Sequence, residues 1–129
     1  MHTVQPRFFQ DANPHYTQGG YVRVHTDVGS DIAFYHLQYH SSANTYTDLF
    51  TSASLPSVSF IHNKGVPLHK LVVGKTPNSV FPTGFVSASA LSDMFLTAYN
   101  DLGWYAGLAY YHYFYDQDGE DLEDAINSL

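Results

Sequence analysis

Short apolar runs alternate with helical patterns along the whole sequence, and this alternation restricts the possible fold more than any other feature. The expected strands cover residues 2–9, 32–39, 71–74 and 104–114. The expected helices cover residues 21–28, 56–64, 87–102 and 118–129. Strands joined by helices pair in parallel, because a tight hairpin cannot connect parallel neighbours. The sequence therefore predicts an α/β protein with about four parallel strands in a single domain over residues 1–129, either as an open sheet or as a fragment of a barrel.

The expected helix at 87–102 has the clearest boundaries. Leu91, Phe95 and Ala98 recur at the spacing of one helix face. Ser87 or Ser89 is a suitable N-cap residue, and Gly103 is a suitable C-terminal stop. We expect this helix to bury that face against the sheet.

Charge and composition exclude several classes of partner. The 129 residues include 5 basic and 12 acidic side chains, and the formal net charge of −7 disfavours binding to the phosphate backbone of nucleic acids. No apolar run approaches the ~18 residues that a transmembrane helix needs. Cysteine is absent, which excludes disulfides and zinc–thiolate sites. We therefore expect no nucleic acid, no membrane and no cofactor among the partners.

The N-terminal residues have neither the basic region nor the apolar stretch of a secretory signal. We expect an intracellular protein unless a further segment precedes Met1 in the natural protein.

Several short segments occur in the order of a known barrel family. Residues 31–38 read DIAFYHLQ, residues 63–75 read NKGVPLHKLVVGK, and residues 83–87 and 103–107 read TGFVS and GWYAG. Residues 31–38 resemble strand six of glycoside hydrolase family 18, the fungal and plant class III-type chitinases, and residues 63–75 resemble the entry into strand seven. Residues 83–87 and 103–107 resemble the helix before strand eight and strand eight itself. Gln5, followed by two phenylalanines, resembles the end of strand five in the same family.

The resemblance implies half of a (β/α)8 TIM barrel, equivalent to strands five to eight. A complete barrel needs about 250 residues. The catalytic motif of the family, D-x-x-D-x-D-x-E, lies on strand four, outside this sequence, so we do not expect an active chitinase. Half a barrel has two open edges and an exposed concave face, which a second copy would cover. We therefore expect a homodimer with two half-sites at one barrel mouth.

Two of the expected strands carry polar side chains on one face. Strand alternation places His36, Gln38 and His40 together, and it places Tyr111 and Tyr113 together on the last strand. At the positions of His40 and Tyr111, the family has a Tyr and a Trp that contact the sugar. Two interpretations fit these departures from the family: an interior refitted for another ligand, and drift of the site after loss of activity.

His40 and Tyr111 are the candidate catalytic residues if the protein is an enzyme, because imidazole gains and loses a proton near neutral pH. The candidate ligand-binding residues are His36, Gln38, Tyr113 and Gln5. The histidines also allow two other interpretations, a Zn²⁺ or Cu²⁺ site and a hydrogen-bonded role in the core or at its rim.

Asp116, Asp118 and Glu120 directly follow the last expected strand. Carboxylates clustered in this way bind hard cations such as Ca²⁺, and they raise one another's pKa. They also stabilise the first turn of a helix through its dipole, or simply face solvent. These three residues are weak candidates for a metal site.

Three functions fit these patterns. The first is non-hydrolytic binding of an N-acetylglucosamine-type carbohydrate by a chitinase-like protein that lacks the catalytic acid. The second is a small enzyme, of isomerase or cyclase type, that acts on an apolar molecule through His40 and Tyr111. The third is a structural fragment without a ligand.

Overall fold

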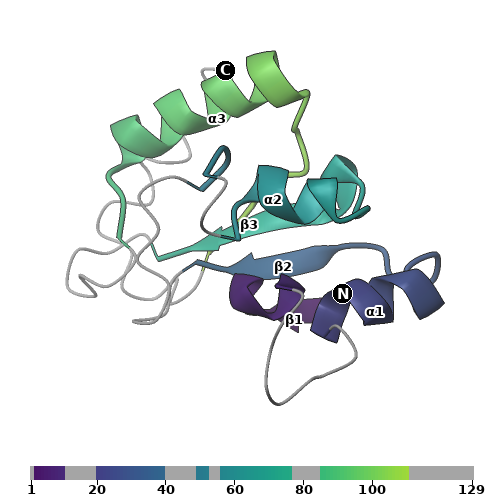
Figure 1. The fold of residues 1–129 in the computed structure, drawn as a ribbon. Helices are drawn as coiled ribbons and strands as arrows, with labels where there is room; N and C mark the ends of the chain where they lie inside the picture. Colours follow the sequence, from purple (N-terminus) through teal and green to yellow (C-terminus); the bar gives the residue numbers. More distant parts are fainter. Residues whose placement is uncertain (1, 11–19, 40–48, 53–55, 77–84, 111–129) are drawn as a thin grey trace.

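The computed structural model describes residues 2–10, 20–39, 49–52, 56–76 and 85–110. Figure 1 shows the order of the elements. The strands are β1 (His2–Val4), β2 (Tyr35–Gln38), β3 (Leu71–Lys75) and β4 (Leu108–Tyr110). The helices are α1 (Gly20–Val28), α2 (Val58–Asn63) and α3 (Ala88–Leu102), with short 3₁₀ turns η1 (Pro6–Phe9) and η2 (Leu68–Lys70).

The four strands form one sheet in the order β1-β2-β3-β4, and each neighbouring pair is parallel. The prediction of an α/β fold with four parallel strands is therefore confirmed. In register, Leu37 lies opposite Val4 on one side and Val73 on the other. Each strand thus pairs with the strand that follows it in the chain.

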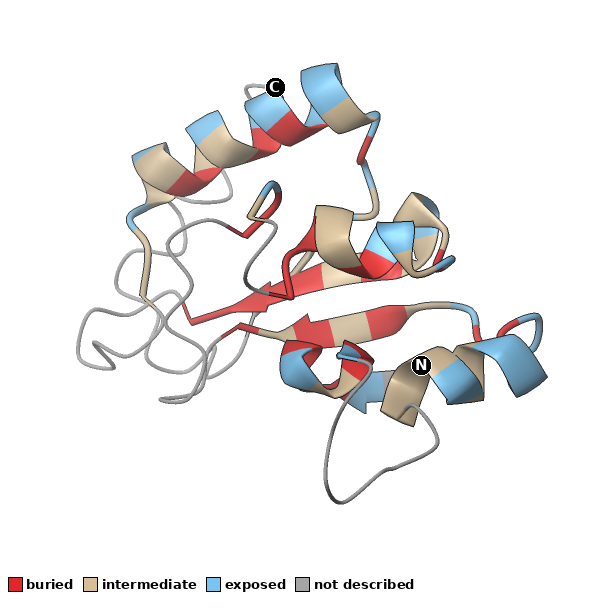
Figure 2. Ribbon diagram, in the orientation of Figure 1, coloured by how far each residue is buried: buried red, intermediate tan, exposed pale blue. Residues whose placement is uncertain are grey.

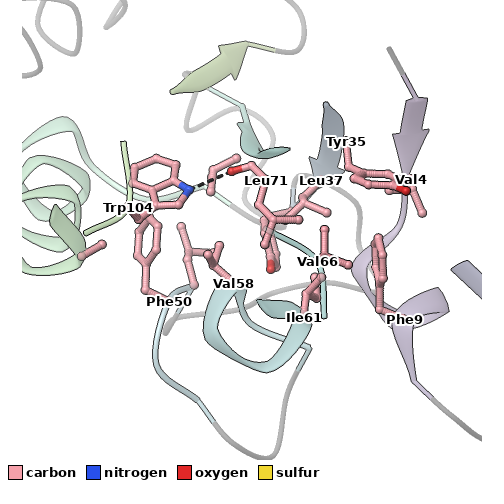
Figure 3. Packing of buried hydrophobic residues seen from close by; sticks show 14 of the residues in the cluster. Val4, Phe9, Tyr35, Leu37, Phe50, Val58, Ile61, Val66, Leu71 and Trp104 are labelled. Carbon is pink, nitrogen blue, oxygen red and sulfur yellow. Dashed lines mark hydrogen bonds between the residues drawn. The ribbon is translucent and has the colours of Figure 1, made fainter. Parts of the chain in front are cut away.

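The helices pack against one face of this sheet. A right-handed crossover that always steps in the same direction places each connecting helix on the same side. Tyr35, Leu37, Leu71 and Val73 alternate along β2 and β3, and all four belong to a single buried cluster. That cluster also contains buried side chains of α2 and α3, and Figure 3 shows strand and helix residues meeting in one layer.

Aromatic rings fill the two ends of the core. Near β1, the ring of Phe9 lies edge-on to that of Tyr35, with 5.5 Å between their centroids. Near β4, Trp104 packs 4.8 Å from Phe50 and 5.1 Å from Phe95. The buried residues of α3 lie on the side of the helix that faces the other elements, while its outer side is exposed (Figure 2).

The predicted boundaries of α3 are confirmed. The side chain of Ser87 accepts a hydrogen bond from the backbone N–H of Ala90, as an N-cap residue does. Gly103 ends the helix in the left-handed region, with φ of 70°. Glycine adopts this conformation without the steric cost of a Cβ atom.

Three of the predicted strands begin later or end earlier than expected. The second covers Tyr35–Gln38 rather than residues 32–39, and residues 111–114 of the last lie outside the described residues. The first ends at Val4, because Pro6 begins the 3₁₀ turn and cannot donate a ladder hydrogen bond. The last begins at Leu108 rather than at Trp104. Trp104 instead turns into the core, where its indole Nε1 donates to the carbonyl of Leu71 at 2.8 Å. The expected helix at 118–129 lies outside the described residues.

We expect Trp104→Phe to lower the free energy of unfolding by about 2 kcal/mol, because it leaves the buried Leu71 carbonyl without this donor and shortens a core side chain. Denaturant unfolding followed by circular dichroism measures the loss. Tyr105→Phe is the matched control, because Tyr105 is 70% exposed. Equal stabilities of the two variants would contradict this role of Trp104.

Candidate functional site

The carboxyl ends of all four strands meet at one edge of the sheet. Gln5 follows β1, Gln38 is the last residue of β2, and Lys75 is the last residue of β3. The register aligns Gln38 with Gly74 and Lys75 with Tyr110. Parallel α/β proteins bind their ligands at this edge, because the loops that leave the strands converge there. We call it the carboxyl edge and treat it as the candidate site.

The sheet face that points away from the core carries small and polar residues. None of the described helices covers this face, which we call the helix-free face. By alternation and register it presents Thr3, His36, Val72 and Ala109. Gln38 shares that face, in agreement with the alternating burial along β2. Most of these residues are half-buried. The polar side chains on this face therefore lie next to the carboxyl edge without being fully excluded from solvent.

Gly74 makes room for the imidazole of His36. A Cβ atom at position 74 would collide with the His36 ring and would lie 2.8 Å from the carbonyl oxygen of Leu37. The glycine therefore lets the ring lie across β3. Burial lowers the pKa of His36 below its usual value, so the neutral imidazole is favoured.

Two buried polar atoms near this edge have no hydrogen-bond partner among the residues that the structure describes. They are the amide oxygen Oε1 of Gln5 and the hydroxyl Oγ1 of Thr76. Thr76 itself is 3% exposed. Leaving such a group unsatisfied costs about 1–3 kcal/mol. Native proteins keep few of them, so each one is a candidate contact for a ligand or an ordered water.

Lys75 is a site residue that the sequence analysis did not select. Its side chain is 1% exposed, and its Nζ donates to the backbone oxygen of Tyr39 at 3.3 Å. Within the described part of the chain, no carboxylate lies within ion-pair distance of this ammonium. Burial lowers the pKa of Lys75 to about 8. One feature of the sequence could have identified it. Lys75 is the single charged residue of an apolar strand, and by alternation its side chain lies on the same face as the buried Leu71 and Val73.

The structure places three of the predicted site residues at or beside the carboxyl edge: His36, Gln38 and Gln5. The remaining predicted site residues lie outside the described residues. These are His40, Tyr111, Tyr113, Asp116, Asp118 and Glu120. Their roles stay predictions.

A second concavity lies away from this edge, between α3 and β4. It has a volume of about 590 Å³ and is lined by Phe95, Leu96, Tyr99, Trp104, Tyr105 and Leu108. The lining is mainly apolar and aromatic, and it offers few groups that could orient a polar ligand. The carboxyl edge therefore has the stronger chemistry for recognition.

Two kinds of feature are absent from the part of the chain that the structure describes. No group of three His, Asp or Glu side chains there could hold a metal ion. None of the described helices has the length and apolarity needed to cross a membrane.

Comparison with known proteins assigns no family. No family model, no curated protein and no solved structure matches this chain. The resemblance to glycoside hydrolase family 18 therefore stays a prediction based on short motifs.

We expect Lys75→Met to stabilise the protein at pH 7 and to lose this advantage at high pH. The pKa of Lys75 is about 8 in the folded chain, against an ordinary value of 10.5. Below pH 8 the lysine must be buried charged or lose its proton on folding, and both cost free energy. Because the unfolded chain binds more protons between pH 8 and 10.5, the stability of the wild type rises with pH in this window.

The measurement is the difference in unfolding free energy between Lys75→Met and the wild type at pH 7 and pH 10. We expect this difference to shrink by about 2 kcal/mol. Titrating tyrosines affect both proteins alike, so the difference isolates Lys75. A difference that stays constant with pH would show that Lys75 keeps an ordinary pKa.

Proposed function

We propose that this protein binds a neutral, polyhydroxylated ligand of the N-acetylglucosamine type at the carboxyl edge and does not hydrolyse it. The observation that carries the proposal is the pair of buried polar atoms, Gln5 Oε1 and Thr76 Oγ1, that have no partner within the described residues. An amide oxygen accepts hydrogen bonds from sugar hydroxyls and from an acetamido N–H, and a threonine hydroxyl both donates and accepts. A polar ligand without charge satisfies both groups.

The described carboxylates support binding without hydrolysis. Glycosidases protonate the leaving oxygen with an Asp or Glu residue at the site, and most families add a second carboxylate on the other side of the bond that is cleaved. The four carboxylates in the described ranges are Asp27, Asp31, Asp93 and Asp101. They lie in helices or in the turn before β2, and none of them follows a strand at the carboxyl edge.

The proposal includes a half barrel completed by a second copy of the chain. Its support is the strand order, because consecutive parallel strands with their helices on one face are the arrangement of a (β/α)8 barrel. Among the described strands, β1 and β4 are the outer ones of the sheet. Pairing of each β1 with the partner's β4 would close eight strands and remove both edges. The helix-free face would then become the barrel interior.

A second candidate function is acid–base catalysis on an apolar small molecule by His40 with Tyr111. The observation that favours it is the neutral imidazole of His36, whose pKa burial lowers, on the expected face of His40. A neutral imidazole at working pH is the form that accepts a proton from a substrate.

We expect Thr76→Val to weaken binding of di-N-acetylchitobiose about tenfold, because the ligand loses one hydrogen bond. Stability should stay equal or rise, since the hydroxyl has no partner to lose in the described structure. Isothermal titration calorimetry and thermal unfolding measure the two effects. The matched control is Thr97→Val, because the hydroxyl of Thr97 donates to the backbone of its own helix at 2.9 Å. Failure of the wild type to bind this sugar at millimolar concentration would overturn the proposed ligand class.

We expect sedimentation equilibrium at micromolar concentration to give a mass twice that of one 14.5 kDa chain. Ala109→Arg places a charged side chain on the helix-free face and should yield a monomer or an unfolded chain. Thr97→Arg, on the exposed side of α3, should leave the dimer intact. A wild-type protein that is folded and monomeric would rule out barrel closure by dimerisation.

A further inference from the structure

The concavity between α3 and β4 exposes apolar side chains that no described element covers. Three residues of its lining are largely exposed: Leu96 at 43%, Tyr99 at 61% and Tyr105 at 70%. In the described ranges, Val28 is the one other large apolar side chain with comparable exposure. Exposed apolar side chains that gather in one place mark a surface that another segment or molecule covers.

The chain leaves the sheet beside this α3–β4 concavity. Leu108, the first residue of β4, lines the concavity, and residues 111–129 follow the last residue of the strand. Each of β1, β2 and β3 is followed by a helix on the covered face of the sheet. A helix that follows β4 in the same way lies next to α3, over β4, and this is where the concavity is found.

The sequence of residues 118–129 carries a surface that matches the concavity. All four of its apolar residues fall at the spacing i, i+3, i+4 and i+7 of one helix face: Leu122, Ala125, Ile126 and Leu129. The other positions are polar or glycine, so a helix here has a single apolar stripe. A short helix of this kind is stable only when its stripe is packed against another surface. The lining of the concavity has no charged side chain, so packing the stripe there buries no lining charge.

The connection between β4 and this segment is long enough to reach the concavity. Residues 111–117 span up to about 23 Å when extended. Because the segment is attached to β4, its effective concentration at the concavity is on the order of millimolar. At micromolar protein concentration, the chain's own segment therefore competes successfully with the same segment of a second copy.

We propose that residues 118–129 occupy the α3–β4 concavity as a helix, with the apolar stripe turned inward. This helix completes the layer on the covered face and removes the exposed tyrosines of the lining from solvent. The concavity lies away from the carboxyl edge, so its occupation leaves ligand binding there unchanged. A helix on the face of β4 also leaves the hydrogen-bonding edge of that strand open.

The first test is disulfide trapping, which the absence of native cysteine makes unambiguous. Tyr99→Cys is combined in turn with Leu122→Cys, Ile126→Cys or Leu129→Cys. The matched control replaces Tyr99→Cys by Asp101→Cys, because Asp101 lies two residues further along α3 and therefore on the opposite side of the helix. Oxidation with copper phenanthroline at micromolar protein should close at least one Tyr99→Cys pair within a single chain. We expect this pair to form at least about tenfold faster than any control pair.

The second test needs no cross-link. Ile126→Asp places a charge on the apolar stripe, whereas Asn127→Asp adds the same charge beside it on the polar side of the expected helix. We expect Ile126→Asp to lower the midpoint of thermal unfolding by about 5 °C or more, because the charge would lie against an apolar lining. Asn127→Asp should leave the midpoint within about 1 °C of the wild type.

Three results would overturn the proposal. A disulfide that forms mainly between two chains, seen as a dimer on non-reducing electrophoresis, would make a second copy the occupant. Equal trapping rates for the Tyr99→Cys and Asp101→Cys sets would place the segment elsewhere. Equal unfolding midpoints for Ile126→Asp and Asn127→Asp would leave the concavity to a separate molecule. Circular dichroism of each variant under reducing conditions confirms that the compared proteins are folded.

Discussion

Parallel pairing between β2 and β3 is the interaction on which the rest of the molecule depends. It buries Tyr35, Leu37, Leu71 and Val73 on one face, and the helices cover that face. The same pairing aligns Gln38 with Gly74, which brings the polar strand ends to one edge. The register between β2 and β3 therefore determines both which side chains form the core and which polar groups lie at the candidate site. A slip of one residue would turn the apolar set outward and separate His36 from Gly74.

Much of the architecture could be predicted from local signals. The apolar run at 71–74 and the spacing of Leu91, Phe95 and Ala98 identified β3 and α3, and Ser87 and Gly103 marked the ends of α3. These signals are short-range, since a cap or a stop depends on hydrogen bonds within one turn of helix. The start of β4 was predicted too early for the opposite reason. An apolar run such as residues 104–107 looks the same whether it pairs in a sheet or fills the core, and only the tertiary contact between Trp104 and Leu71 distinguishes the two.

The candidate site was predictable only in part. Alternation correctly grouped His36 with Gln38, because strand geometry follows directly from sequence spacing. Burial, however, is a property of the assembled chain. Nothing in the spacing indicates that the Thr76 hydroxyl lacks a partner within the described structure or that Lys75 is sealed beneath the backbone of Tyr39. A charged residue at a strand end is usually solvent-exposed. The sequence analysis therefore used Lys75 only as part of the segment 63–75 that resembles the barrel family, and it did not select Lys75 as a site residue.

The strand order has a consequence for how the molecule is made. Because β1 pairs with β2, β2 with β3 and β3 with β4, the sheet can grow by one strand at a time as the chain leaves the ribosome. Each of β2, β3 and β4 finds its preceding neighbour already synthesised, so these three strands do not wait for a partner later in the chain. When α3 and β4 are added, the indole of Trp104 reaches the carbonyl of Leu71 in β3, which is already paired with β2. This hydrogen bond then fixes the segment between α3 and β4 against the sheet. Synthesis from the N-terminus and assembly of the sheet thus proceed in the same direction.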